Sequence, residues 1–233
     1  MPSLGDLASE AYIYVYPLVE NLRQVRRYVD EGVGSNPAAP FNAFSHAGKL
    51  AGPEDTFVTI NNDTVYSMAQ LDLSGGPVRL EVPDTGERYY VLQFVDAWTN
   101  NIAYVGTRAT GNRAGRFVIV PPDWRSDLPD GHTPIQASTA IVSIVGRIAC
   151  TGPEDIPAVT ALQGAFVLDA LETEASESSG FPAAAVVSDE LLFWEQARAW
   201  SLAFPAPAQD APYAERYSPL AGHQRLDGWD ARL

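Results

Sequence analysis

The sequence predicts a mainly β protein, a sandwich or barrel of short antiparallel strands with helices toward both ends of the chain. Two observations lead to this fold class. Short runs rich in β-branched and aromatic residues follow one another through the middle of the chain, and turn-forming clusters separate them. No helical pattern lies between consecutive runs, which argues against a parallel sheet built from β-α-β units.

The first element is a helix expected over residues 3–30. Apolar residues recur there at helical spacing, beginning with Leu4 and Leu7. Ser3 followed by Asp6 resembles a capping box, which would mark the start of the helix. Pro17 lies inside the pattern and should kink or split the helix, because proline lacks the N–H that an internal helical turn needs.

The middle of the chain changes to the spacing of strands. Glycine- and proline-containing turns, such as residues 74–77 and 83–86, separate the runs. Strands are expected over residues 56–60, 66–73, 78–82, 89–98, 102–108, 117–120 and 141–150.

Helical spacing returns in the last third. We expect helices over 153–172 and 189–204, a polar loop over 173–180, and irregular coil over the Pro- and Ala-rich residues 205–233. The predicted organisation is a single domain in three parts. These are an N-terminal helical segment packed on the sandwich (1–35), the β-sandwich core (36–152), and the C-terminal helices with an irregular tail (153–233).

Composition and charge exclude several classes of partner. The chain has 233 residues, 46% hydrophobic and 19% charged, which is ordinary for a globular protein. Its net charge of −14 would repel a phosphate backbone or an anionic membrane surface, so we expect neither nucleic acid nor a membrane as a partner. No apolar stretch approaches the roughly 18 residues of a membrane span, and no export signal opens the chain. We therefore expect a cytoplasmic location.

The densest polar cluster lies between two expected strands and consists of Asn61, Asn62, Asp63 and Thr64, with Tyr66 close behind. Asn and Asp tolerate left-handed backbone angles and bond their own main chain, so a tight turn explains the cluster. In the functional interpretation, Asp63 is a carboxylate base or anchor, and the other four side chains hydrogen-bond a ligand.

A second carboxylate, Asp96, falls on the same strand face as Tyr90, Phe94 and Trp98. Such a carboxylate must be paired, protonated or open to a pocket, because burial of an unpaired charge is costly. It either caps a turn at the end of the strand or serves as a catalytic acid or base, with Trp98 and Asn100 contacting the ligand.

Arg147 interrupts a strand that is apolar on both faces. A guanidinium there needs an acidic partner, and Asp96 or Asp63 are the candidates. The alternative is an anion-binding arginine at the floor of a pocket.

Two further residues are candidate ligand contacts. Tyr14 precedes the proline of the first helix, and its phenol could reach a cavity, although packing also explains it. His46 lies near the Asn/Asp cluster in sequence.

The three histidines lack metal-ligand spacing, so we predict no metal site. The lone Cys150 lies in an apolar run and is expected to be a small core residue. Motifs of serine hydrolases, phosphate loops and dinucleotide sites are absent from the sequence, so no cofactor is expected.

Taken in order, these polar clusters resemble the domain-of-unknown-function 1254 family. The segments that carry the resemblance are 14–19 (YVYPLV), 41–46 (FNAFSH), 61–66 (NNDTVY), 71–73 (LDL), 88–90 (RYY), 96–100 (DAWTN) and 146–147 (GR). The resemblance implies a jelly-roll-like antiparallel β-sandwich with flanking helices, and it brings no established activity. Many members continue into a second β-rich domain, the 1214 family, and many carry export signals. Neither is expected here, so a pocket that two domains form elsewhere would be open, closed by the C-terminal tail, or completed by another subunit.

Three functions remain open. The first is an enzyme without a redox cofactor, in which Asp63 or Asp96 moves a proton and Arg147 holds developing negative charge. Isomerisation, dehydration, cyclisation or hydrolysis of a small organic molecule would suit it, and specialised biosynthesis is one setting for such an enzyme. The second is a protein that binds a small molecule without converting it. The third is a structural or interaction domain without a cavity. A homodimer is compatible with each of the three.

Overall fold

The computed structural model describes residues 3–55, 61–171, 180 and 182–221. The chain forms two compact units. The sandwich unit is Gln24–Gly180, and the helical unit combines Met1–Arg23 with Phe181–Leu233. Helix α1 (Leu4–Asp30) begins in the helical unit and ends in the sandwich unit. The strand expected over 56–60 lies outside the described residues.

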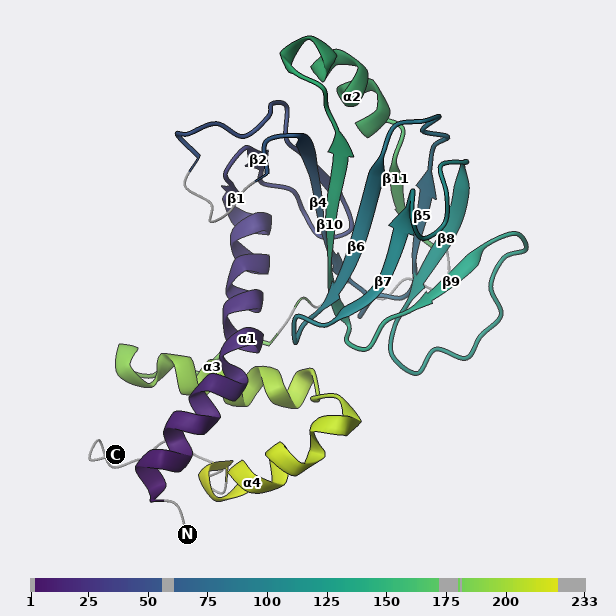
Figure 1. Ribbon diagram of the computed structural model, residues 1–233. Helices are drawn as coiled ribbons and strands as arrows, with labels where there is room; N and C mark the ends of the chain where they lie inside the picture. The colour runs from purple at the N-terminus through teal and green to yellow at the C-terminus, as the bar shows by residue number, and fades with distance from the viewer. Residues whose placement is uncertain (1–2, 56–60, 172–179, 181, 222–233) are drawn as a thin grey trace. The chain divides into compact units, whose positions relative to one another are not determined.

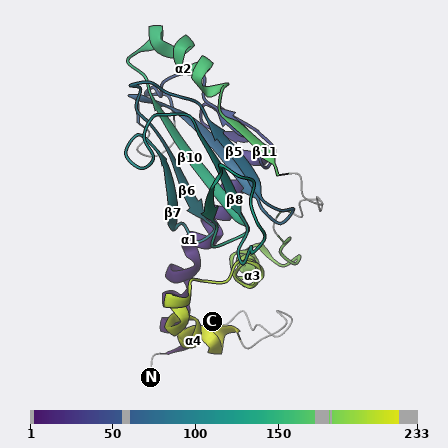
Figure 2. The same ribbon diagram turned by 90° about the vertical axis from the view of Figure 1, so that its right-hand side faces the viewer.

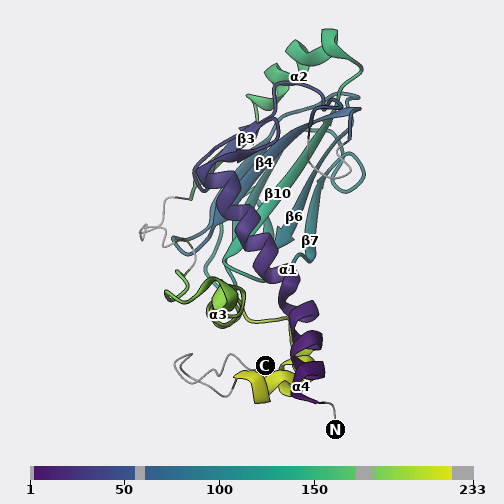
Figure 3. The same ribbon diagram turned by 90° about the vertical axis from the view of Figure 1, so that its left-hand side faces the viewer.

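Two sheets make up the core of the sandwich unit, and Figures 1 and 2 show them as two layers. The five-stranded sheet, seen with its strands labelled in Figure 3, has the order β3 (Phe44–His46), β4 (Thr64–Asp72), β10 (Ile141–Ala149), β6 (Tyr90–Asp96), β7 (Asn101–Gly106). The four-stranded sheet has the order β11 (Val167–Ala170), β5 (Val78–Val82), β8 (Gly115–Val120), β9 (Thr133–Gln136). A separate short hairpin pairs β1 (Gly32–Val33) with β2 (Asn36–Pro37). The prediction of a mainly β fold with flanking helices is confirmed.

One strand pair departs from the antiparallel pattern. Strands β8 and β9 are parallel, with Phe117 opposite Thr133 and Val120 opposite Gln136. Parallel neighbours cannot be joined by a tight turn, because the chain must first return to the starting end of the sheet. The long loop over residues 121–132 makes this return. Strand β9 was not predicted, because the turn-forming residues of that loop gave no sign of a strand after them.

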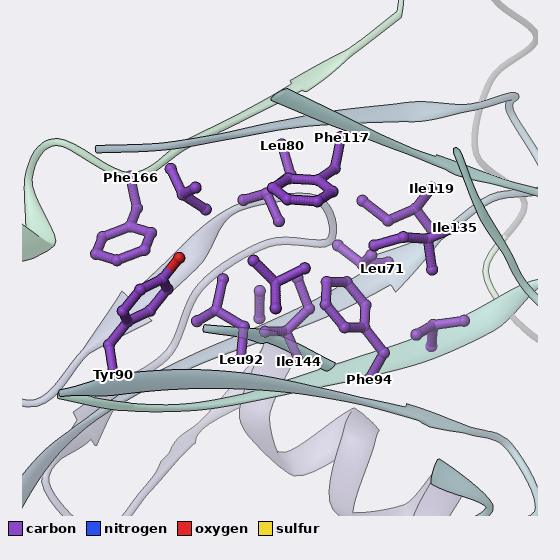
Figure 4. Packing of buried hydrophobic residues seen from close by; sticks show 14 of the residues in the cluster. Leu71, Leu80, Tyr90, Leu92, Phe94, Phe117, Ile119, Ile135, Ile144 and Phe166 are labelled. Atoms are coloured by element: carbon purple, nitrogen blue, oxygen red, sulfur yellow. The ribbon is translucent and has the colours of Figure 1, made fainter. Parts of the chain in front are cut away.

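Alternation along the strands divides each sheet into a dry face and an outer face. Leu92 and Phe94 on β6 and Ile144 on β10 point between the sheets, where Leu80 and Phe117 meet them from the other layer (Figure 4). All five side chains are 6% exposed or less. Successive residues of a strand point to opposite faces, so the residues between these core positions lie on the outer face of their sheet.

The segment after β10 closes one end of the sandwich. A 3-10 turn (Pro153–Asp155) leads into α2 (Ile156–Gln163), whose Val159 joins the core. The helix is shorter than the predicted 153–172, because it ends at Gly164 and the chain then pairs with β5 as the edge strand β11. Arg88, just before β6, holds this end in place: its guanidinium donates to both carboxylate oxygens of Asp155, at 2.6 and 2.7 Å.

The helical unit contains the first part of α1, together with α3 (Asp189–Ala203), a 3-10 turn (Ala208–Asp210) and α4 (Ala211–Ala221). The predicted capping box is present, since Ser3 Oγ accepts from the Asp6 N–H at 3.1 Å and Asp6 accepts from the Ser3 N–H at 3.1 Å. Helix α1 continues through Pro17 without being split, and the buried residues Leu18 and Val19 that follow offset the missing hydrogen bond.

Helix α4 corrects the prediction of irregular coil after residue 204. It begins at Ala211 and places Pro212 in its first turn, where no internal hydrogen bond is lost. Proline at that position starts a helix rather than breaking it. Among the helices that the structure describes, none is long and apolar enough to cross a membrane.

The Arg88–Asp155 pair predicts a pH dependence of stability. The hydrogen bonds from Arg88 hold the pKa of Asp155 well below its ordinary value. A carboxyl group whose pKa is lowered on folding stabilises the fold above its unfolded pKa, about 4, and loses that contribution as the pH falls through its folded pKa. Asp155→Asn should therefore lower the free energy of unfolding at pH 7, and the difference from the wild type should shrink steadily below about pH 4.

Urea unfolding from pH 2 to 7 measures this difference. Asp123→Asn is the matched control, because the Asp123 side chain is 94% exposed and its arginine partner is 77% exposed. A loss in Asp155→Asn that stays constant down to pH 2 would show that the charge of Asp155 is not the cause.

Candidate functional site

An open hollow of about 600 Å3 lies at the end of the five-stranded sheet where β4 begins and β10 ends. Its lining comes from three places in the chain. Asn61, Asp63, Thr64 and Tyr66 come from the start of β4, Arg147, Ala149, Cys150 and Thr151 from the end of β10, and Tyr89 and Arg108 from the segments flanking β6 and β7.

Strand register explains why these residues meet. Thr64 is opposite Ala149, and Tyr66 is opposite Arg147, across the β4–β10 pair. The Ala149 N–H donates to the Tyr89 carbonyl, which places Tyr89 on the far side of Ala149. Ile148 and Tyr90, the neighbours of Ala149 and Tyr89, point into the core. The hollow therefore lies on the outer face of the sheet.

The pair formed by Arg147 and Tyr66 is the central feature of the hollow. The Cζ atom of Arg147 lies 5.5 Å from the centroid of the Tyr66 ring, within the range of a cation–π contact. Arg147 forms no ion pair with any residue that the structure describes. Neither of the acidic partners expected from the sequence, Asp63 and Asp96, is bonded to it. A half-buried guanidinium is thus left facing the hollow.

A second arginine–tyrosine pair lies across the hollow. The Cζ atom of Arg108 is 5.6 Å from the centroid of the Tyr89 ring. Neither residue was predicted from the sequence as part of a site. Strand alternation could have identified Tyr89. Because Tyr90 points into the core, its neighbour Tyr89 must lie on the outer face, which is also the face of Arg147. Arg108 could not be added without the register between β6 and β7.

The Asn/Asp cluster forms a turn at the edge of the hollow. The Asn61 side chain accepts from the Asp63 N–H at 2.8 Å, and the Asn61 N–H donates to the Tyr66 hydroxyl at 3.1 Å. The Asp63 carbonyl accepts from the Cys150 N–H at 3.0 Å and extends the β4–β10 ladder. The predicted turn is therefore present. It also brings Asp63, whose carboxylate bonds to no described residue, to the rim of the hollow. Asn62 is exposed beside it.

Thr64 supplies a buried polar atom without a partner. Its side chain is 6% exposed, and its Oγ1 has no hydrogen-bond partner among the described residues. Hydroxyl groups in protein interiors are nearly always hydrogen-bonded, since an unpaired one costs roughly 1–3 kcal/mol. Thr64 is one of the residues that line the hollow, but this oxygen itself is covered by the surrounding protein.

Asp96, in contrast, belongs to the opposite end of the sheet. Asp96 is opposite Val142 in β10, whereas Asp63 is bonded to Cys150. At about 3.3 Å per residue, Val142 and Cys150 are roughly 26 Å apart along the strand direction. Asp96 is 1% exposed. It accepts from the Trp98 N–H at 2.9 Å and the Asn100 N–H at 2.8 Å.

Ser138 also donates to Asp96, at 2.7 Å, and the Asn100 side chain donates at 3.2 Å. The carboxylate thus stabilises the turn after β6. This agrees with the interpretation of Asp96 as a residue that caps a turn at the end of the strand. Trp98 and Asn100 belong to this turn and do not line the hollow.

His46 lies on the other face of the sheet from Arg147. It is opposite Ser67 in the β3–β4 pair, and its Nδ1 is 2.9 Å from the Ser67 hydroxyl. Its ring stacks on Phe44, which packs against the core. Burial lowers the pKa of His46, which favours the neutral ring. Proximity in sequence to the Asn/Asp cluster did not bring the imidazole to the hollow.

Tyr14 belongs to the helical unit. Its hydroxyl donates to Asp210 at 3.2 Å, and its ring stacks on Tyr213 with centroids 5.2 Å apart. Burial, followed by the nearby Asp210 carboxylate, raises the pKa of Tyr14 well above its ordinary value. Of the residues predicted from sequence, the hollow therefore gathers Asn61, Asp63, Thr64, Tyr66 and Arg147. In the part of the chain that the structure describes, no cluster of three or more His, Cys, Asp or Glu side chains could hold a metal ion.

Fold and site together define a β-sandwich protein with an arginine- and tyrosine-lined hollow on the outer face of one sheet. The chain belongs to the family described as protein of unknown function (DUF1254), which matches residues 41–170. The match covers the strands from β3 to β11 and every residue of the hollow. No curated protein matches the chain.

The solved structures that match this chain include the following two. The VPA0106 protein from Vibrio parahaemolyticus has a TM-score of 0.70 at 23% identity, with 92% of this chain and 51% of that chain covered. An uncharacterized protein from Burkholderia cenocepacia has a TM-score of 0.37 at 13% identity, covering 91% of this chain and 53% of that one. The first shows a shared fold. The chain spans about half the length of both proteins.

The different surroundings of the two carboxylates predict effects of different size when each is neutralised. Asp96→Asn should lower the free energy of unfolding by about 2–3 kcal/mol, because several donors lose their charged acceptor. Asp63→Asn should change it by less than about 0.5 kcal/mol, because its carboxylate is exposed. Urea denaturation of both variants at pH 7 measures the difference. An equally large loss in Asp63→Asn would make that carboxylate structural.

Proposed function

We propose that this protein binds a small organic molecule in the hollow on the outer face of the five-stranded sheet. The observation that carries the proposal is the half-buried Arg147, which lines the hollow and forms no ion pair with a described residue. A volume of about 600 Å3 is the size of a small-molecule site.

The contrast between the two ends of the sheet supports the proposal. At the far end, Asp96 is surrounded by donors from the protein itself. At the end with the hollow, Arg147 contacts a tyrosine ring and Asp63 is bonded to no described side chain. Polar groups that served only to set turns would be saturated at both ends. The structural or interaction domain is therefore the least favoured of the three functions.

Catalysis is the second candidate, and one observation favours it. Asp63 is the only carboxylate among the described residues that line the hollow, and Arg147 and Tyr66 line the same hollow. A carboxylate there can accept a proton from a bound molecule, while Arg147 stabilises the negative charge that develops. The pair of acids considered from the sequence is reduced to Asp63, because Asp96 lies at the other end of the sheet.

Turnover distinguishes an enzyme from a binding protein. A molecule that binds the wild type is incubated with the protein and followed by mass spectrometry. For an enzyme, Asp63→Asn should retain binding within about threefold and lose at least about a hundredfold in rate. Equal rates in both proteins would exclude Asp63 as the acid or base.

Specialised biosynthesis, a cytoplasmic location and a homodimer stay predictions.

Filling the hollow tests binding itself. Ala149 is a small residue between Thr64 and Tyr89 on the outer face, so Ala149→Leu places a bulky side chain on the floor of the hollow. A fragment library of neutral, anionic and cationic molecules is screened by ligand-observed NMR. We expect the hits on the wild type to weaken at least about tenfold in Ala149→Leu.

Ala158→Leu serves as the matched control. It adds the same side chain at an exposed position of α2 and should leave the hits unchanged. Both variants should show cooperative thermal unfolding close to that of the wild type. A library in which no hit responds to Ala149→Leu would overturn the proposal.

A further inference from the structure

We propose that the molecule bound in the hollow is a small organic monocarboxylate with a flat apolar body, anchored by Arg147. This inference rests on the proposed function and gives the chemical class of its ligand. It is carried by three features of the hollow: its unpaired arginines, its charge balance, and the spacing of its two tyrosines.

The arginines of the hollow differ from most others in the chain. Eight described arginines form ion pairs with carboxylates, as Arg88 does with Asp155 and Arg79 with Asp169. Acidic residues outnumber Lys and Arg by 29 to 15, so partners are plentiful. Arg147 and Arg108 nevertheless pair with no described carboxylate. Each is held against a tyrosine ring instead.

A cation–π contact leaves the N–H groups of a guanidinium available to a carboxylate. The N–H bonds lie in the plane of the group, so a ring over its face does not compete for them. Two parallel N–H donors on one edge match the two oxygens of a carboxylate. Because Tyr66 already restricts the Arg147 side chain, less conformational entropy is lost when an anion binds.

The charge balance favours a single negative charge. Two guanidinium groups and one carboxylate, Asp63, line the hollow, which leaves an excess of one positive charge. A monoanion neutralises that excess. A dianion such as a phosphate monoester would carry a second charge into a site whose rim already holds Asp63, and like charges repel across such short distances.

The remaining surface suits a flat apolar body. Tyr66 lies on β4 and Tyr89 precedes β6, with Ala149 on β10 between them. Strands two places apart are separated by roughly 10 Å, so the small Ala149 side chain leaves room above it for a single unsaturated ring. Tyrosine rings on both sides would contact such a ring edge-on or face-on.

Benzoate, benzamide and phenyl phosphate are the probes. They share a phenyl ring and carry one, no and up to two negative charges. Dissociation constants come from chemical-shift titrations of the 15N-labelled full chain at pH 7. We expect benzoate to bind at least about tenfold more tightly than benzamide, because a hydrogen bond between charged groups contributes about that much affinity. Benzoate should also bind more tightly than phenyl phosphate.

Variants of the anchor test the role of Arg147. Arg147→Gln should weaken benzoate at least about tenfold while changing benzamide by less than about twofold. Arg147→Lys keeps the charge but loses the paired donors, so it should fall between the wild type and Arg147→Gln. Arg116→Gln, which removes an exposed arginine from β8 in the other sheet, is the matched control and should have no effect on benzoate.

The outcomes separate this inference from the proposed function. Benzoate binding that weakens in both Arg147→Gln and Ala149→Leu supports the inference. Benzamide or phenyl phosphate binding as tightly as benzoate, and still sensitive to Ala149→Leu, overturns the carboxylate and leaves a small-molecule site. Benzoate binding that ignores Arg147→Gln also overturns it. If no molecule of any charge responds to Ala149→Leu, both proposals fall.

Discussion

The strict two-residue alternation of strand β10 is the constraint on which the site depends. This strand pairs on both sides, with β4 and with β6, so its register is fixed by two ladders at once. Ile144 and Ile148 enter the dry core, and Arg147 and Ala149 take the outer face. A slip of one residue would exchange the two sets and drive a guanidinium between the sheets. Gly146 reinforces the register, because a Cβ there would meet the Ser67 carbonyl oxygen of β4. The residue that precedes Arg147 thus enforces the close approach of the strand that carries Tyr66.

The same alternation explains why one end of the sheet is saturated and the other is not. Asp96 is an inward residue at the end of β6, and its carboxylate accepts hydrogen bonds from the turn that follows it and from Ser138. Arg147 is an outward residue at the other end of the sheet, and it forms no ion pair with any described residue. A charge on the inner face must be satisfied by the protein, whereas a charge on the outer face can remain open to a ligand. The face on which each charged group lies therefore gives the two groups different roles.

Much of the fold followed from local pattern, and much of the site did not. Strands β4, β5, β6, β8 and β10 were predicted within a few residues, because apolar alternation and turn residues are local signals. The edge strand β11 was missed, since Val167–Ala170 continues an apolar run that also suits a helix. The hollow was half predicted: the Asn/Asp cluster and Arg147 stand out as polar groups beside apolar strands. Tyr89 and Arg108 do not stand out, and only the pairing of β10 with β6 and of β6 with β7 brings them to the same face. Pairings between strands far apart in sequence leave no local trace.

The acidity of the chain makes the location of these two arginines more informative. A net charge of −14 creates a field that disfavours an approaching anion at long range. At physiological salt that field is screened within about 8 Å, so the last step of binding depends on the groups that line the site. An anion therefore gains little until it reaches a guanidinium that is not already neutralised. Most described arginines are paired with carboxylates, and Arg147 is half-buried against Tyr66 where water screens it less. Recognition of an anion by such a protein has to be local, and the outer face at the end of β10 combines an unneutralised guanidinium with a hollow of about 600 Å3.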